Sequence, residues 1–156
     1  MSATGGPFAE RHGWKLIQAS AFAHTLAALQ AEVERLAAGK PDAYRAHPKT
    51  KLLARVLALI LDEIPRDPNA RVYALGATLG PAHRHWRRAK FLQRFRLFFR
   101  FDSASRIIVY AWMNDENTLR KVGARSDPYA VFAQRLDVGD PPDDWNELLA
   151  ETRRRP

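Results

Sequence analysis

The chain of 156 residues contains no cysteine, no long apolar run and no glycine-rich phosphate-binding loop. The absence of cysteine excludes disulfides and thiolate-based metal or redox sites. No apolar run approaches the roughly 20 residues of a membrane-spanning helix. The first 14 residues also lack the apolar stretch of a secretory signal. We therefore expect a cytoplasmic protein without a membrane partner.

Familiar catalytic patterns are also missing. No nucleophile elbow is present, and Gly76 and Gly80 are too loosely spaced for a phosphate loop. The carboxylate pairs at 115–116 and 143–144 fall in expected loops or helix starts, where capping explains them. His83 and His85 have a spacing that metal sites sometimes use, but no third ligand stands near them in the sequence. We therefore expect no metal and no cofactor, and interpret His85 as a loop histidine or a phosphate contact.

Acidic residues are absent from one particular stretch. Residues 71–100 contain eight Lys and Arg but no Asp or Glu, whereas the other 126 residues contain 17 basic and 17 acidic residues. This stretch therefore carries the whole formal net charge of +8. Such a concentration of unopposed positive charge indicates a surface that meets a polyanion.

The centre of the basic stretch predicts a β-strand over residues 94–101, with the sequence RFRLFFRF. Alternate side chains of a strand point to opposite faces, so the residues at 95, 97, 99 and 101 form a core face. The other face then carries Arg94, Arg96, Phe98 and Arg100. Guanidinium groups bind phosphate through paired hydrogen bonds, and an exposed phenyl ring can stack on an unpaired base. A solvated outer face is the alternative, but no carboxylate nearby in the sequence neutralises these arginines, so we predict that this second face binds a nucleic acid.

The segments on either side extend the prediction. Residues 86–92 form a second strand that places Arg88 and Lys90 on one face and Arg87 on the other, and a turn near Gln93 brings Arg88 and Lys90 beside the arginines. Residues 106–113 are apolar on both faces, which is typical of a covered central strand. A polar loop at 114–117 then brings Arg120 back over the sheet.

Elsewhere the hydrophobic pattern is helical, with stripes over 20–39 and 49–64 before the sheet and shorter helices from 127 and 141 after it. We expect a single α+β domain over residues 1–156, in which two N-terminal helices pack on a small antiparallel sheet and the C-terminus is helical. Residues 1–12 and 150–156 are expected to be flexible ends.

A cationic cluster of this kind suits the cleavage of RNA by its own 2′-OH. That reaction needs no nucleophile or metal from the protein, only orientation of the strand, stabilisation of charge on the phosphorane and transfer of protons. Arg88, Lys90, Arg96 and Arg120 are the candidate catalytic residues. Arginine cannot act as the base, so the first proton goes to Lys90, to a histidine at 83 or 85, or to water.

Several motifs resemble the YhaV family of bacterial type II toxins, within the wider RelE/ParE-like ribonuclease group. The similar stretches are TKLLA at 50–54, RAKF at 88–91, RFRLFFRF at 94–101, WMNDENTLR at 112–120 and DPYAVF at 127–132. The resemblance implies a RelE-like fold and an endoribonuclease that cuts mRNA, at or with the ribosome, and so arrests translation. It also implies an AbrB-like antitoxin whose complex with the toxin binds operator DNA and represses their operon.

The resemblance assigns roles to individual residues as well. Arg96 matches the functional arginine of RelE-like relatives, Arg88 and Lys90 match basic residues on their preceding strand, and Arg120 matches a basic residue after their last strand. Tyr129 is the nearest match to a late tyrosine, and we place it among the RNA-binding residues, which are Arg87, Arg94, Phe98, Arg100, His85 and Tyr129. Two alternatives stay open: a nucleic-acid-binding module without catalysis, and a ParE-like toxin that targets gyrase.

Overall fold

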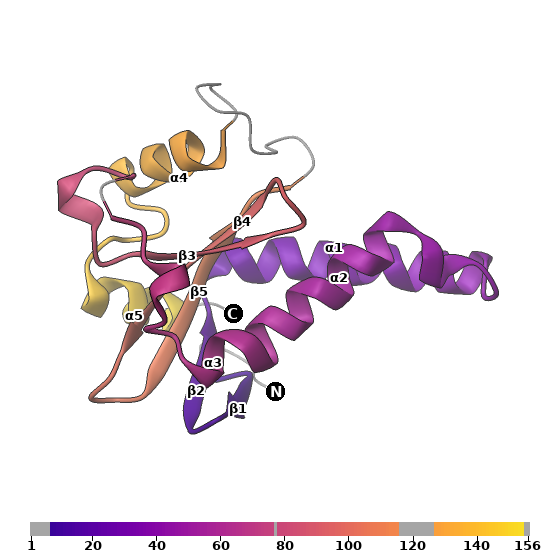
Figure 1. Cartoon of the computed structure of the whole chain (residues 1–156), viewed down its shortest axis with the longest axis horizontal. Coiled ribbons are helices and arrows are strands. Elements are labelled where there is room, and N and C mark those ends of the chain that lie inside the picture. Colours follow the sequence, from indigo (N-terminus) through magenta and orange to yellow (C-terminus); the bar gives the residue numbers. More distant parts are fainter. Residues whose placement is uncertain (1–6, 77, 116–126, 155–156) are drawn as a thin grey trace.

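The structure, a computed structural model, describes residues 7–76, 78–115 and 127–154 of the chain. A five-stranded sheet with the order β1-β2-β5-β4-β3 lies at its centre (Figure 1). The strands are β1 (Ala9–Arg11), β2 (Trp14–Gln18), β3 (Arg87–Phe91), β4 (Phe95–Asp102) and β5 (Ile107–Met113). The α-helices are α1 (Ser20–Gly39), α2 (Pro48–Ala58), α3 (Ile64–Arg66), α4 (Pro128–Asp137) and α5 (Trp145–Arg154).

The sheet is mixed, so the prediction of a purely antiparallel sheet was wrong in one pair. β2 pairs with β5 in parallel, whereas the pairs β1–β2, β3–β4 and β4–β5 are antiparallel. A parallel pair requires a long crossover connection, and the chain between β2 and β5 supplies it with helices and a hairpin. The α+β composition and the central position of β5 were predicted correctly.

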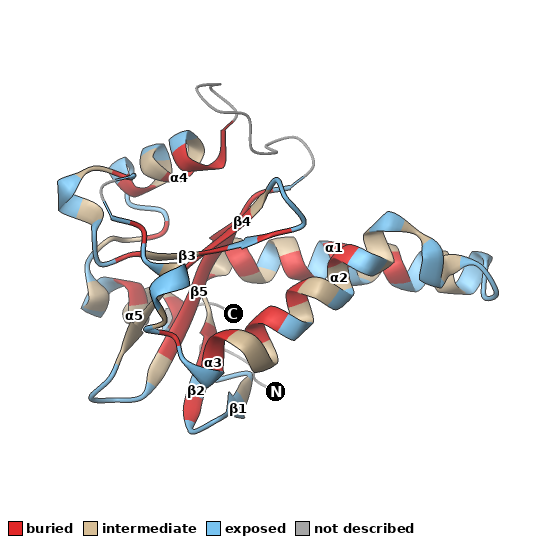
Figure 2. Cartoon of the chain, in the orientation of Figure 1, coloured by how far each residue is buried: buried red, intermediate tan, exposed pale blue. Residues whose placement is uncertain are grey.

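Helices and loops cover both faces of the sheet (Figure 2). On one face, apolar side chains of β4 and β5 pack with α1 and α2 in a cluster that includes Phe22, Leu97 and Phe99. On the other face, the neighbouring side chains of the same strands pack with α4 and α5 around Phe98 and Phe132. β4 is therefore buried on both sides, and neither of its faces is an open platform.

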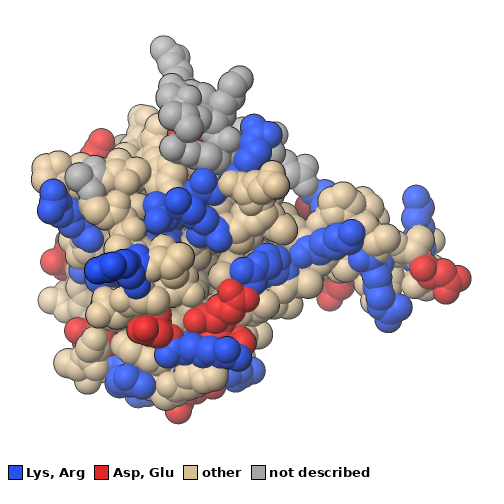
Figure 3. All heavy atoms as spheres, viewed as in Figure 1, with Lys and Arg blue, Asp and Glu red and all other residues tan. Residues whose placement is uncertain are grey.

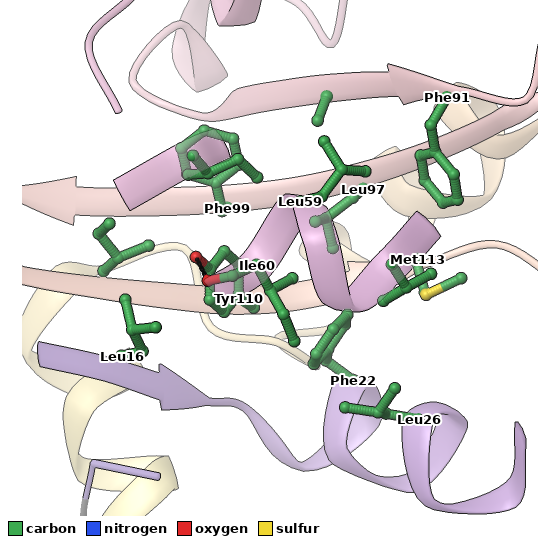
Figure 4. Close-up of a cluster of buried hydrophobic side chains, with 14 of the residues drawn as sticks. Leu16, Phe22, Leu26, Leu59, Ile60, Phe91, Leu97, Phe99, Tyr110 and Met113 are labelled. Atoms are coloured by element: carbon green, nitrogen blue, oxygen red, sulfur yellow. Dashed lines mark hydrogen bonds between the residues drawn. The ribbon is translucent and has the colours of Figure 1, made fainter. Parts of the chain in front are cut away.

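A π-helical segment, Leu59–Glu63, joins α2 to α3 and explains one buried tyrosine. The N–H of Ile64 donates to the carbonyl of Leu59, five residues back. The next bond in this pattern would reach the carbonyl of Ile60 from Pro65, which has no N–H to donate. The hydroxyl of Tyr110 donates to that carbonyl instead, at 2.6 Å, and the two residues lie side by side in the core (Figure 4). Burial raises the pKa of Tyr110 well above its usual value.

α1 and α2 lie side by side and project beyond the sheet as a helical arm (Figure 1). The predicted stripe of α1 is confirmed, with Phe22, Leu26, Leu29 and Val33 buried. At the N-terminus of α1, the backbone N–H of Ser20 donates to the carboxylate of Glu151 on α5 at 3.2 Å.

Parts of both predicted flexible ends have regular structure. Residues 9–11 form β1, which pairs with β2. Residues 150–154 belong to α5, and Thr152 on that helix is fully buried. The C-terminal helix is therefore anchored almost to its end.

Candidate nucleic-acid interface

The hairpin of β3 and β4 brings three of the predicted basic residues to one face. Leu92 and Gln93 form its turn with φ of 45° and 68°, a left-handed conformation that non-glycine residues seldom adopt. The resulting register sets Lys90 opposite Arg96 and Arg88 opposite Phe98. The predicted pairing of the two strands through a turn near Gln93 is confirmed.

Arg88 and Arg96 converge on the hydroxyl of Tyr129. The Nη1 of Arg88 and the Nε of Arg96 each donate to the Oη of Tyr129 at 3.1 Å. Both guanidinium carbons also lie near the face of its ring, 6.0 Å and 5.8 Å from the centroid. Tyr129 is held at the start of α4, where the carboxylate of Asp127 accepts from its backbone N–H at 3.0 Å. We call these three residues the Arg88–Arg96–Tyr129 cluster.

The Arg96 side chain is buried and rigidly held, with 7% of its surface exposed. Its Nη1 donates to the carbonyls of Gln93 and Phe95, both at 2.9 Å. Among the described residues, the hydrogen bonds of its guanidinium all go to neutral oxygens. The Nε of Arg88 is buried without a hydrogen-bond partner. The cluster thus keeps positive charge, and one unused donor, in a partly dry environment.

Asn114 is a site residue that the sequence analysis missed. Its side chain is fully buried at the end of β5, where its Oδ1 accepts from the backbone N–H of Arg96 at 2.7 Å. Its Nδ2 donates to the carbonyl of Arg94 at 3.1 Å. A polar residue directly after an apolar strand is the sequence signal that marked this position.

Lys90 and Arg94 are the exposed members of the basic hairpin. Lys and Arg side chains gather on the face of the molecule seen in Figure 3, over β3 and β4 and along the helical arm. Lys90 and Arg94 are therefore accessible to a polyanion, whereas Arg96 is buried.

Phe98 corrects one prediction. Its ring is fully buried, stacked on Phe132 at 4.3 Å between centroids and packed edge-on against Tyr129 at 5.6 Å. An exposed ring at this position was predicted from strand alternation, which identifies the two faces of a strand but not what covers each face. Phe98 therefore packs against Tyr129 inside the core and is not available to stack on a base.

Arg100 and Arg87 also lie away from the cluster. Arg100 is half-buried between the rings of Trp86 and Trp145, at 5.6 Å and 5.5 Å, and bonds the carbonyl of Asp143. Desolvation lowers the pKa of Arg100. Arg87 points to the opposite face, over the ring of Phe101 at 5.5 Å. Both arginines therefore contact aromatic rings of the fold, and their contacts with RNA stay predictions.

His85 joins a second polar cluster, centred on Asp143. The Oδ1 of Asp143 bonds the indole N–H of Trp86 at 2.7 Å, His83 at 2.9 Å and His85 at 3.1 Å. Burial opposes ionisation of Asp143, but the hydrogen bonds from Trp86 and His83, together with the electrostatic attraction of His85 and His83, outweigh it and lower the pKa of this carboxyl. The carboxylate of Asp143, which is far away in the sequence, therefore lies beside the basic stretch. The N-terminus of α5 is capped by the neighbouring Asp144, whose carboxylate accepts from the backbone N–H of Glu147.

Other predictions concern features that the structure addresses only in part. Arg120 lies outside the described residues. Within the described ranges, His, Cys, Asp and Glu nowhere gather in a group of three or more that could hold a metal ion. No helix among those residues is long and apolar enough to cross a membrane.

Comparison with known proteins identifies the family. The model of a family described as a toxin with endonuclease activity, of a toxin–antitoxin system, matches residues 16–153. The chain is 42% identical over 143 residues to the ribonuclease toxin YhaV of Escherichia coli (strain K12) and to the toxin YhaV of Escherichia coli O157:H7. Each alignment covers 90% of this chain and 93% of the relative. No solved structure matches the chain significantly. The chain belongs to the YhaV family of endonuclease toxins from toxin–antitoxin systems.

Proposed function

We propose that this toxin cuts RNA and that the Arg88–Arg96–Tyr129 cluster is the centre of its active site. The observation that supports the proposal is the convergence of two guanidinium groups on one phenol oxygen, each at 3.1 Å. The ribonuclease named among the relatives supports RNA as the substrate.

The cluster has the chemical groups that the reaction needs. The 2′-oxygen of one nucleotide attacks the adjacent phosphorus, a bond from this oxygen to phosphorus forms, and the bond to the 5′-oxygen of the next nucleotide breaks. Negative charge develops on the phosphoryl oxygens, where Arg88 and Arg96 stabilise it without needing to reorient, because their side chains are already held. The products carry a 2′,3′-cyclic phosphate and a 5′-hydroxyl.

Two residues are suited to the proton transfers. The Tyr129 oxygen accepts from both arginines, so its own O–H serves as a donor, and we assign it to protonate the leaving 5′-oxygen. Lys90 lies opposite Arg96 in the strand register. We assign Lys90 to accept the proton of the attacking 2′-OH. His83 and His85 are less suited because both are bonded to Asp143.

Membership of a toxin–antitoxin family supports a proposal for the partner and the wider setting. We propose a RelE-like ribonuclease that acts on mRNA in the cytoplasm, at or with the ribosome. We further propose that its antitoxin is AbrB-like and that the complex binds operator DNA. An endonuclease family favours this reading over a non-catalytic module or a gyrase-targeting toxin.

The test is to incubate the purified toxin with a defined mRNA, with and without ribosomes and with and without EDTA, and to analyse the new ends. We expect cleavage that survives the chelator and leaves 2′,3′-cyclic phosphates. Two results together would contradict the proposal: loss of cleavage when EDTA is present, and 5′-phosphate ends on the products formed without EDTA. Intact RNA in every arm would also contradict the proposal and would favour the two alternatives.

A further inference from the structure

The far end of the helical arm carries a second concentration of positive charge. We define the distal arm as residues 35–51, which run from the end of α1 to the start of α2. This segment contains five Lys and Arg and one Asp. Arg35, Lys40, Arg45 and Lys51 are exposed, and Lys49 pairs with the carboxylate of Glu32 at 3.1 Å.

The charge of the molecule is unevenly distributed around this arm. Residues 127–151 hold seven Asp and Glu but a single basic residue, Arg135. The acidic residues thus accumulate in the C-terminal segment that contains α4 and α5, and these two helices pack on the opposite face of the sheet from α1 and α2. The arm therefore extends positive charge away from the acidic part of the molecule.

Positive charge on the arm and on the hairpin is presented to the same side. In Figure 3, Lys and Arg side chains follow the arm on the face that also shows those over β3 and β4. α1 has 20 residues, which corresponds to about 30 Å at 1.5 Å per residue. A nucleic acid that lies on the hairpin can therefore continue along the arm.

The surface of the distal arm fits a phosphate backbone better than a protein. The large apolar side chains that are exposed in the described residues are Phe8, Val72, Leu92 and Val138, and they all lie outside the arm. A stable protein interface needs an apolar centre, whereas binding to phosphates needs only positive charge. Arg45 also stacks on Tyr44, with its guanidinium carbon 5.2 Å from the ring centroid.

We infer that the distal arm is a second RNA-binding surface, which holds the substrate beyond the cleavage site and takes no part in the cleavage. This inference rests on the proposed function, because it takes the substrate to be RNA. Electrostatic contacts of this kind add affinity without reading sequence. The arm would therefore favour long or structured RNA over short RNA.

The test compares two triple variants that remove equal charge. The arm variant is Lys40→Gln, Arg45→Gln and Lys51→Gln, and the control is Arg11→Gln, Lys15→Gln and Arg153→Gln, all exposed residues. Binding is measured with a long 2′-O-methyl RNA, which cannot undergo 2′-OH attack. Cleavage is measured with an RNA of about five nucleotides, roughly 17 Å at 3.4 Å each, which is too short to span the arm.

We expect the arm variant to bind the long RNA about tenfold more weakly, with a salt slope reduced by about 2, since each lost phosphate contact removes about 0.7. It should cut the short RNA as fast as the wild type, and the control should match the wild type in both assays. Equal affinity of the two variants for the long RNA would overturn the inference. If the wild type bound the long RNA but did not cut the short RNA, the proposed cleavage would fail while the arm result would stand.

Discussion

The Nε of Arg96 on β4 donates a hydrogen bond to the hydroxyl of Tyr129 on α4 at 3.1 Å. The two residues are 33 positions apart in the sequence, and the bond joins the sheet to the helix that covers it. Their proximity depends on the packing of Phe98 against Phe132 and Tyr129. The candidate active site is therefore built on a core, and its geometry depends on the docking of α4.

Asn114 should matter more for activity than for folding. Asn114→Ala removes the acceptor of the Arg96 backbone N–H and the donor to the Arg94 carbonyl. A buried donor left unsatisfied costs about 1–3 kcal/mol, and a small displacement of Arg96 can lower the cleavage rate by about 100-fold. Denaturant unfolding and single-turnover cleavage measure the two effects.

The control for Asn114 is Asn69→Ala, which removes an exposed side chain that bonds Arg87 on the opposite face. It should leave cleavage unchanged. A folded Asn114→Ala protein that cuts RNA at the wild-type rate would show that the backbone at Arg96 needs no such support.

Tyr110→Phe tests the explanation of the π-helical segment. The substitution leaves the buried carbonyl of Ile60 without a donor, so we expect the free energy of unfolding to fall by about 1–3 kcal/mol. Tyr44→Phe, at a half-buried position on the arm, serves as the control and should change it by less than about 0.5 kcal/mol. Equal effects of both substitutions would mean that the Tyr110 bond does not compensate for Pro65.

The Asp143 cluster predicts a pH dependence of stability. The folded pKa of Asp143 is lowered, because its burial is outweighed by the hydrogen bonds from Trp86 and His83 together with the electrostatic attraction of His85 and His83. Its stabilising contribution is therefore fully present above the unfolded pKa of about 3.9. That contribution is lost as the pH falls through the lower folded pKa. Unfolding free energies of the wild type and of Asp143→Asn should therefore converge in acid, and a constant difference from neutral pH to acid would contradict this.

The antitoxin should recognise the exposed part of the basic hairpin. We expect fast, salt-sensitive association of toxin and antitoxin, because opposite charges steer the encounter. Lys90→Glu with Arg94→Glu should slow the association rate, whereas the Arg11→Glu, Lys15→Glu pair should not. If neither salt nor the Lys90/Arg94 charge reversal changed the association rate, the antitoxin would inhibit the toxin at another surface, for instance at α4.

The sequence predicted most elements of the fold and the basic hairpin, because these depend on local patterns, but it missed β1. Alternation correctly grouped Arg88, Lys90 and Arg96 on one face. It could not show that α4 and α5 cover that face, which buries Phe98 and encloses Arg100. The parallel β2–β5 pair and the hydrogen bonds of Asn114 likewise join residues that are far apart in the sequence. Local sequence patterns do not predict such contacts.

The most direct measurement is the single-turnover cleavage rate of a defined RNA by Arg96→Gln, Tyr129→Phe and the control Arg87→Gln, each with its fold verified by circular dichroism. Removing one preorganised donor to a developing charge typically costs 10²–10³-fold in rate. We predict a loss of about this size for Arg96→Gln, a clear loss for Tyr129→Phe, and a rate within about threefold of the wild type for Arg87→Gln, whose side chain lies on the opposite face. Wild-type cleavage by folded Arg96→Gln and Tyr129→Phe proteins would contradict the assignment of the active site to this cluster.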